Sequence, residues 1–116
     1  MTYEQVLKQI DVNIEETLQR FSGNKELMEK FIKKFPEDNT TEDLEKAIKA
    51  KDYKAIEDTA HTLKGLSGNL GFSKLFELSS ALVNAIRAND FSTADTLSPK
   101  VIELSHFIAK AINGIN

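Results

Sequence analysis

The chain has 116 residues, of which 41% are apolar and 28% charged, and its formal net charge at pH 7 is −3. This length suits one domain but not a core plus a separate catalytic domain, and lysines spread among acidic residues leave no basic stripe for a nucleic acid. No apolar run approaches the roughly 20 residues that cross a bilayer, the N-terminus lacks the pattern of a secretion signal, and there is no cysteine for disulfides or thiol chemistry. We expect a single domain over residues 1–116, monomeric and cytoplasmic, without a membrane or nucleic-acid partner.

Apolar residues recur at helical spacing through most of the sequence, and no segment alternates for long enough to be a strand. After a weakly patterned start, residues 14–21 predict a short helix that stops at Ser22-Gly23. Asn24 then caps a second helix, which ends at Pro36. The apolar stripe of this second helix consists of Leu27, Met28, Phe31, Ile32 and Phe35.

Cap residues predict the starts of the next two helices. Thr40 and Asp43 resemble a capping pair that opens a third helix. Asp52 is the candidate cap of a longer helix, from about Tyr53 to Leu70. The apolar positions of the third helix are Leu44, Ala47 and Ile48.

Two more helical regions follow. Ser73 can cap the first, and Asn89-Asp90 forms the turn after it. The segment around Ser98-Pro99 allows two interpretations: proline either opens a fresh helix at its first position, or kinks one helix over about residues 93–112. We favour a short first piece joined to a helix over residues 99–112. The residues expected to face inward before the turn are Leu75, Phe76, Leu78, Leu82, Val83 and Ile86. Since most connections are short, neighbouring helices should be antiparallel, and the expected fold is an all-α bundle.

The helix predicted over residues 53–70 carries the run His61-Thr62-Leu63-Lys64-Gly65-Leu66-Ser67-Gly68-Asn69-Leu70-Gly71. On a helical wheel of about 100° per residue, its apolar stripe consists of Ile56, Thr59, Ala60, Leu63, Ser67 and Leu70. His61, Gly65 and Gly68 fall about 120–180° from Ile56 on that wheel, with Lys64 at about 80°. We therefore expect His61 to project away from the core, beside the two glycines.

Glycine inside a helix costs ~1 kcal/mol relative to alanine, so Gly65 and Gly68 need a reason other than stability. One explanation is close packing against a neighbouring helix. The other is access, because a missing side chain lets a bulky partner approach the backbone. Their position on the face of His61 favours access. Gly71 is better explained as the C-cap of the helix.

An exposed imidazole beside an ammonium group suits one kind of chemistry. A neutral imidazole is a good nucleophile near neutral pH, since its unperturbed pKa is about 6.5. Lys64, one turn from His61, can neutralise an anionic group on that ring, and a phosphoryl group is the obvious anion. The chain has no Walker loop, kinase glycine-rich loop or evident magnesium site. The phosphoryl group must therefore arrive already activated, from another macromolecule.

The run resembles the motif of the histidine-containing phosphotransfer (HPt) family: a histidine, two residues, Lys-Gly, a stretch of small residues, then Asn-Leu-Gly. The resemblance covers about residues 14–112, through the apolar positions on either side and the turns at Asp52 and Asn89-Asp90. Leu66 and Gly68 depart from the pattern, since Ser and Ala are common there, and Gly68 would open the surface further. The matching residues are His61, Lys64, Gly65, Ser67, Asn69, Leu70 and Gly71.

The resemblance implies an elongated domain with an antiparallel four-helix bundle core, extra short N-terminal helices, and the histidine exposed midway along one helix. It also implies a phosphorelay intermediate in two-component signalling. His61 would accept a phosphoryl group from the aspartyl phosphate of a receiver domain and pass it to another receiver aspartate. Lys64 would stabilise the phosphate, and Gly65 and Gly68 would let the receiver dock.

The same resemblance sets expectations for partners and cofactors. The partners would be response-regulator receiver domains and a hybrid histidine kinase. The chain would need no cofactor, with magnesium supplied by the receiver, and it would be a carrier rather than an enzyme with its own kinase activity. Met1, with little sequence before the first helical pattern, favours a free-standing protein over a domain of a larger kinase.

Other candidate features are weaker. His106 has no adjacent Lys-Gly, which favours a bundle or surface role, and Phe72 is expected to pack under a loop. Glu57 and Asp58 precede His61 closely, but two histidines without a matching cluster are a poor basis for a metal site. Two alternatives to phosphotransfer remain: a helical docking module, which would need neither His61 nor Lys64, and a metal-dependent hydrolase, which would need ligands that are not evident.

Overall fold

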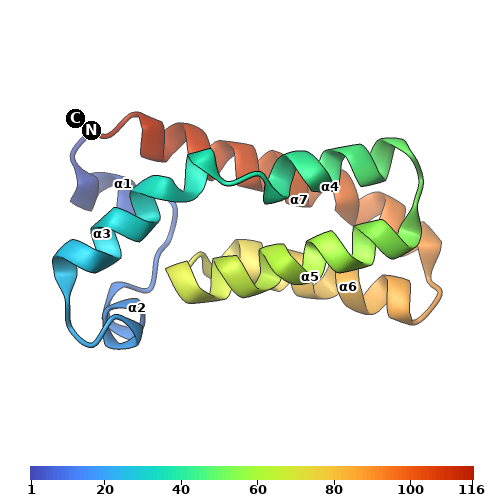
Figure 1. The fold of residues 1–116 in the computed structure, drawn as a ribbon, viewed down its shortest axis with the longest axis horizontal. Helices are drawn as coiled ribbons and strands as arrows, with labels where there is room; N and C mark the ends of the chain where they lie inside the picture. The colour runs from blue at the N-terminus through green and yellow to red at the C-terminus, as the bar shows by residue number, and fades with distance from the viewer.

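The computed structural model describes residues 1–116 and contains helices and no strands, which confirms the predicted all-α class (Figure 1). Its elements are α1 (Tyr3–Gln9), α2 (Ile14–Arg20), α3 (Lys25–Lys34), the 3₁₀ turn η1 (Phe35–Glu37), α4 (Thr40–Lys49), α5 (Tyr53–Leu70), α6 (Ser73–Arg87) and α7 (Phe91–Asn113). None of these helices has both the length and the apolar character needed to cross a bilayer.

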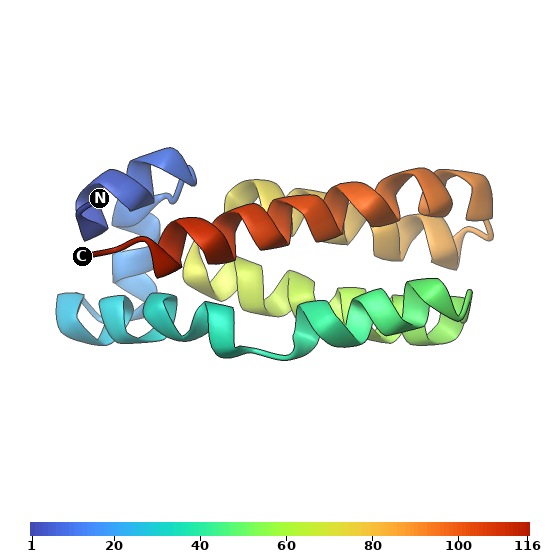
Figure 2. The ribbon, with the colours of Figure 1, turned by 90° about the horizontal axis from the view of Figure 1, so that it is seen from above.

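Helices α4 to α7 form the expected antiparallel four-helix bundle, in which α5 packs against α4 and α6, and α7 packs against α6 and α4. The molecule is elongated, with extents of 40 × 25 × 19 Å. Seen from above, α3 and α4 follow one another on the same side of the molecule, and α7 runs along the whole bundle (Figure 2). The short helices α1 and α2 cover one end, where the two termini also meet, since the amide of Asn116 donates to the carbonyl of Met1.

The core of the bundle is formed by one stripe of buried side chains from each helix. Leu63 of α5 and Leu82 of α6 are completely buried, and burial of one such side chain contributes roughly 1.5–3 kcal/mol. Small polar residues let the helices approach closely: the hydroxyl groups of Ser67 and Ser98 are buried and donate to carbonyls one turn back in their own helices. The other fully or nearly fully buried bundle residues include Leu44, Ile56, Ala60, Leu75, Val83, Val101 and Ile108.

Several predicted helix ends are confirmed. The Asn24 side chain accepts a hydrogen bond from the amide of Leu27 at 3.0 Å, and the Asp52 side chain accepts from Ala55 at 3.2 Å. In the turn after α6, Asp90 accepts from both the hydroxyl and the amide of Thr93. These two bonds lower the pKa of Asp90, because they favour its carboxylate. Each cap satisfies an amide that the first turn of a helix leaves without a partner.

Three helix starts differ from the sequence-based expectation. Helix α1, in the weakly patterned start, was not predicted; Thr2 opens it in a capping box with Gln5. Thr40 does not cap α4, because it is already the first residue of the helix and Asn39 occupies the cap position. The amide of Thr40 donates to the Asp38 carboxylate at 2.8 Å. Ser73 does not cap α6 either. It is the first helical residue, and Phe72 occupies the cap position without a side-chain bond.

Helix α7 is one helix from Phe91 to Asn113 with Pro99 inside it, so the favoured division into two pieces is wrong. Proline in a helix interior cannot donate to the carbonyl four residues earlier. The carbonyl of Asp95 therefore receives no amide bond from position 99, and the buried Ser98 hydroxyl donates to a different carbonyl, that of Ala94, at 2.9 Å. Packing of Ala94, Ser98 and Val101 on the bundle holds the helix together through the proline.

Three apolar residues expected to face inward are exposed. Leu27 and Phe31 of α3 are 37% and 44% exposed, although Met28 and Ile32 of the same helix are buried as predicted. Phe31 stacks on Phe21 at the end of α2, with 5.7 Å between ring centroids. The reason is that α3 has only one side against the bundle. Phe76 of α6 is the third, at 39% exposed.

The end of α5 is closed by α2 and the segment before it. Gly71 ends α5 with φ of 78°, a left-handed conformation that glycine adopts readily, and this confirms its predicted C-cap role. A Cβ at Gly71 would collide with the hydroxyl of the buried Thr17, so glycine also lets α2 approach. Phe72 is buried as predicted; its ring packs edge-on against Phe35, with 5.0 Å between centroids.

Candidate functional site

His61 lies in the middle of α5 and is exposed, as the wheel predicted. The buried face of α5 consists of Ile56, Ala60, Leu63, Ser67 and Leu70, all of which belong to the predicted stripe. Because helix geometry fixes the direction of each side chain, packing of this stripe on α4 and α6 turns His61 towards solvent. Its imidazole is therefore available to a partner in solution.

Lys64 lies one turn after His61 on α5 and is half-buried. Its ammonium nitrogen lies 5.8 Å from the centroid of the Phe76 ring, which comes from α6. A cation at this distance from an aromatic face is attracted by the negative charge of the π-system. Lys64 thus lies beside His61 and over a ring of the neighbouring helix.

The two glycines of the motif have different surroundings. A Cβ added at Gly65 would meet nothing within 4 Å, so the α5 backbone is open there. A Cβ added at Gly68 would lie 3.0 Å from Cδ1 and 3.2 Å from Cε1 of Phe76, closer than normal side-chain contacts. The predicted gap at Gly65 is thus open to solvent, whereas the space at Gly68 is occupied by an aromatic ring of the same chain.

The sequence interpretation placed Phe76 in the core and missed its position on this surface. The numbering around the turn between α5 and α6 could have indicated that position. Gly68 and Phe76 are equally distant in sequence from Phe72, and so are Glu57 and Arg87, which form an ion pair at 2.9 Å. In an antiparallel helical hairpin, residues at equal distances from the turn lie side by side. This symmetry places an aromatic ring opposite a glycine.

The acidic residues before His61 are engaged by cations of the protein. Glu57 accepts from Arg87 of α6, and Asp58 pairs with Lys54 at 3.1 Å. The hydroxyl of Thr62 donates to the carbonyl of Asp58. No group of three or more His, Asp or Glu side chains gathers where it could hold a metal ion.

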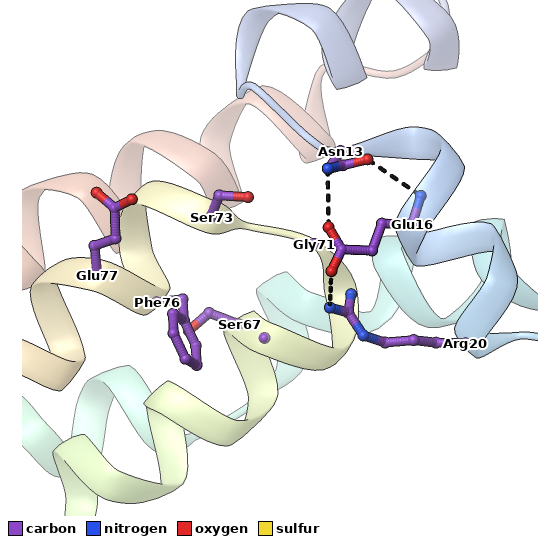
Figure 3. Close-up of a pocket in the computed structure, with 9 residues that line it drawn as sticks. Asn13, Glu16, Arg20, Ser67, Gly71, Ser73, Phe76 and Glu77 are labelled. Carbon is purple, nitrogen blue, oxygen red and sulfur yellow. Dashed lines mark hydrogen bonds and ion pairs between the residues drawn. The ribbon is translucent and has the colours of Figure 1, made fainter.

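A polar groove lies at the far end of this face, beyond Gly68. It has a volume of about 360 Å³ and joins the end of α5 and the start of α6 to α2 (Figure 3). Glu16 of α2 accepts hydrogen bonds from Asn13 and Arg20 there, and the Phe76 ring lies at the side of the groove towards α5. The groove is lined by Asn13, Glu16, Arg20, Ser67, Gly68, Gly71, Ser73, Phe76 and Glu77.

The second histidine lies elsewhere. His106 is exposed on α7, and its Nε2 lies 2.8 Å from the Glu45 carboxylate of α4. This contact links two bundle helices at the surface, in agreement with the bundle or surface role expected from the sequence. His61 is therefore the histidine that combines exposure with a neighbouring lysine and an open backbone.

Comparison with known proteins identifies this arrangement. No curated protein and no solved structure matches the chain. A family model, that of the Hpt domain, matches residues 26–112, which include α4 to α6 and nearly all of α3 and α7. Hpt domains carry phosphoryl groups in two-component phosphorelay signalling and interact with receiver domains and histidine kinases. Together with the helical bundle and the motif from His61 to Gly71, this match shows that the chain belongs to the Hpt domain family.

Proposed function

We propose that this chain is a phosphorelay intermediate whose phosphoryl acceptor is His61. A receiver domain carrying an aspartyl phosphate would dock on the exposed face of α5, and His61 would later pass the group to the aspartate of another receiver. The observation that carries the proposal is the exposure of His61 in mid-helix, one turn from both Lys64 and the open backbone at Gly65.

The chemical step is a transfer between two nucleophiles. The unprotonated ring nitrogen of His61 supplies the electron pair for a new N–P bond, while the P–O bond of the acyl phosphate breaks and its electrons stay on the receiver carboxylate. The reverse step runs the same way to a second receiver. Magnesium would be held by the receiver, so the contribution of this chain is a nucleophile, a cation and an accessible surface.

Phosphoryl acceptance can be tested directly. After incubation with a radiolabelled phosphoreceiver, the protein should carry one phosphate that is labile in acid and stable in alkali, as expected for an N–P bond. His61→Gln should remain unlabelled, while the matched control His106→Gln should label like the wild type. Stable labelling of His61→Gln would contradict the assignment, and an unlabelled wild-type protein would favour the docking-module alternative.

Lys64→Ala should weaken phosphoryl acceptance without unfolding the protein. The ammonium group offsets the negative charge that arrives at His61, and one charge-assisted contact contributes about 1.5–3 kcal/mol, so we expect about a 10- to 100-fold lower kcat/KM. Rapid-quench kinetics with a phosphoreceiver measures the loss, and far-ultraviolet circular dichroism checks the fold. Lys54→Ala, which removes a lysine paired with Asp58, is the control. Unchanged kinetics in Lys64→Ala would remove its role.

A further inference from the structure

The Phe76 ring sits between the two helices of the α5–α6 hairpin and contacts two members of the motif at once. It occupies the space left by the missing Cβ of Gly68, and the Lys64 ammonium lies 5.8 Å from its centroid. The side chain is nevertheless 39% exposed, so burial in the core does not account for its position. A large aromatic residue at the surface, fitted to a glycine and a lysine of the same motif, calls for an explanation at the site.

The fit to Gly68 determines where the ring can lie. Any side chain at position 68 would put a Cβ within 3.0–3.2 Å of two ring carbons, so the ring would have to shift to make room for it. Lys64 reaches its position over the ring from the preceding turn of α5, on the side of His61. A free lysine side chain samples many rotamers, so an attractive surface restricts where its charge is found.

We infer that Phe76 is a positioning residue for Lys64. Its ring packs on Gly68 and keeps the ammonium group of Lys64 close to His61. The phosphoryl group arrives at His61, so the charge is held where it is needed. The inference rests on the proposed function and extends it from the reactive helix α5 to its partner α6. It gives Gly68 an indirect part, because its missing Cβ leaves the space that the ring occupies.

The first test is a set of Phe76 variants. Phe76→Leu should lower kcat/KM for phosphoryl acceptance from a phosphoreceiver about 2- to 5-fold, the effect of losing an exposed cation–π contact. Phe76→Tyr, which keeps an aromatic ring at this position, should react like the wild type. Phe31→Leu is the matched control, because Phe31 is 44% exposed and also lies under a lysine, with 5.7 Å from Lys34 to its centroid, but on α3. It should react like the wild type. Equal kinetics in Phe76→Leu would overturn the inference.

The second test asks whether Phe76 acts through Lys64. In the Lys64→Ala background, Phe76→Leu should cause no further loss, since there is no ammonium group left to hold. The same fold-loss in both backgrounds would overturn the inference and make Phe76 an independent contact of the receiver. Thermal unfolding of each variant shows that the comparison is between folded proteins.

A third measurement needs no receiver and separates this inference from the proposed function. Phosphoramidate can phosphorylate histidine by transferring its phosphoryl group with loss of ammonia, and ³¹P NMR then follows the phosphohistidine signal against pH. A nearby ammonium favours the more negative form, so Lys64→Ala should raise the titration midpoint, and Phe76→Leu should raise it part of the way. An unchanged midpoint in Phe76→Leu contradicts the positioning role. A shifted midpoint without transfer from any receiver would leave it intact and contradict the relay.

Discussion

His61, Lys64 and Gly65 contribute in different ways to one small surface. His61 is exposed because the buried stripe of α5 is on the other side of the helix, and Lys64 follows it by one turn. Gly65 adds no group at all; it leaves the backbone open where a Cβ would meet nothing. A reaction with a small molecule would not need this opening, whereas a folded partner would.

Gly65 allows stability and function to be separated. Gly65→Ala should raise the free energy of unfolding by about 0.5–1 kcal/mol, because alanine is a better helix former and its Cβ meets nothing. Gly65→Gln should fold as well but lower the rate of receiver transfer on the order of tenfold or more, since a displaced partner loses the alignment of the reacting atoms. Chemical denaturation and rapid-quench kinetics measure the two effects.

Gly68→Ala is the matched control for the stability part. Its Cβ would press on the Phe76 ring, so it should gain less stability than Gly65→Ala. Full transfer activity in Gly65→Gln would show that the receiver does not approach along this stretch of backbone.

At the scale of helices, the α5–α6 hairpin builds the surface. Its turn at Gly71 and Phe72 requires a left-handed glycine, and its symmetry pairs Gly68 with Phe76 and Glu57 with Arg87. The position of the Phe76 ring relative to Lys64 thus depends on the geometry of this turn. Phe72 anchors this turn in the core through its contact with Phe35.

Helix ends were predictable where a polar side chain performs the capping, as at Asn24 and Asp52. They were not predictable at Thr40 and Ser73. The amides of these two residues are already bonded to preceding residues, to the carboxylate of Asp38 and to the carbonyl of Gly71, and both residues lie inside the first turn of their helix. Local sequence patterns do not decide between two adjacent candidates of this kind. The tertiary position of the neighbouring helices does.

Pro99 tests how far packing overrides local preference in α7. Proline in a helix interior costs ~3 kcal/mol relative to alanine. Proline also restricts the unfolded chain, which offsets about 0.4–1 kcal/mol of that cost, so Pro99→Ala should raise the free energy of unfolding by about 2–2.5 kcal/mol. Lys100→Ala, at the next exposed position, should stay within about 0.5 kcal/mol of the wild type. Urea titration of the three proteins gives these values. Destabilisation by Pro99→Ala would mean that packing of the bundle requires proline at this position.

At the scale of the whole molecule, the bundle supports the exposed face of α5 that carries His61. The four helices bury their apolar stripes against one another, and α5 packs on both α4 and α6. These contacts fix the direction in which the exposed side of α5 faces. The family match does not include α1 and α2, which close the end of the bundle beside Gly71. They border the polar groove next to Phe76.

The division between what could and could not be predicted follows the range of the interactions. The periodicity of Ile56, Leu63 and Leu70 predicted the helix and the exposure of His61, because both depend on one helix. The position of Phe76 depends on two helices, and its apolar character alone suggested burial. The continuity of α7 through Pro99 likewise depends on contacts with the rest of the bundle.

The most direct test of the relay is a reconstitution with two receiver domains. One receiver is phosphorylated with ³²P and freed of excess donor, and the second receiver is added with or without this protein. We predict that label reaches the second receiver only when the protein is present, passing through an acid-labile intermediate, and that His61→Gln abolishes the transfer. Transfer of label at the wild-type rate by His61→Gln would contradict the account.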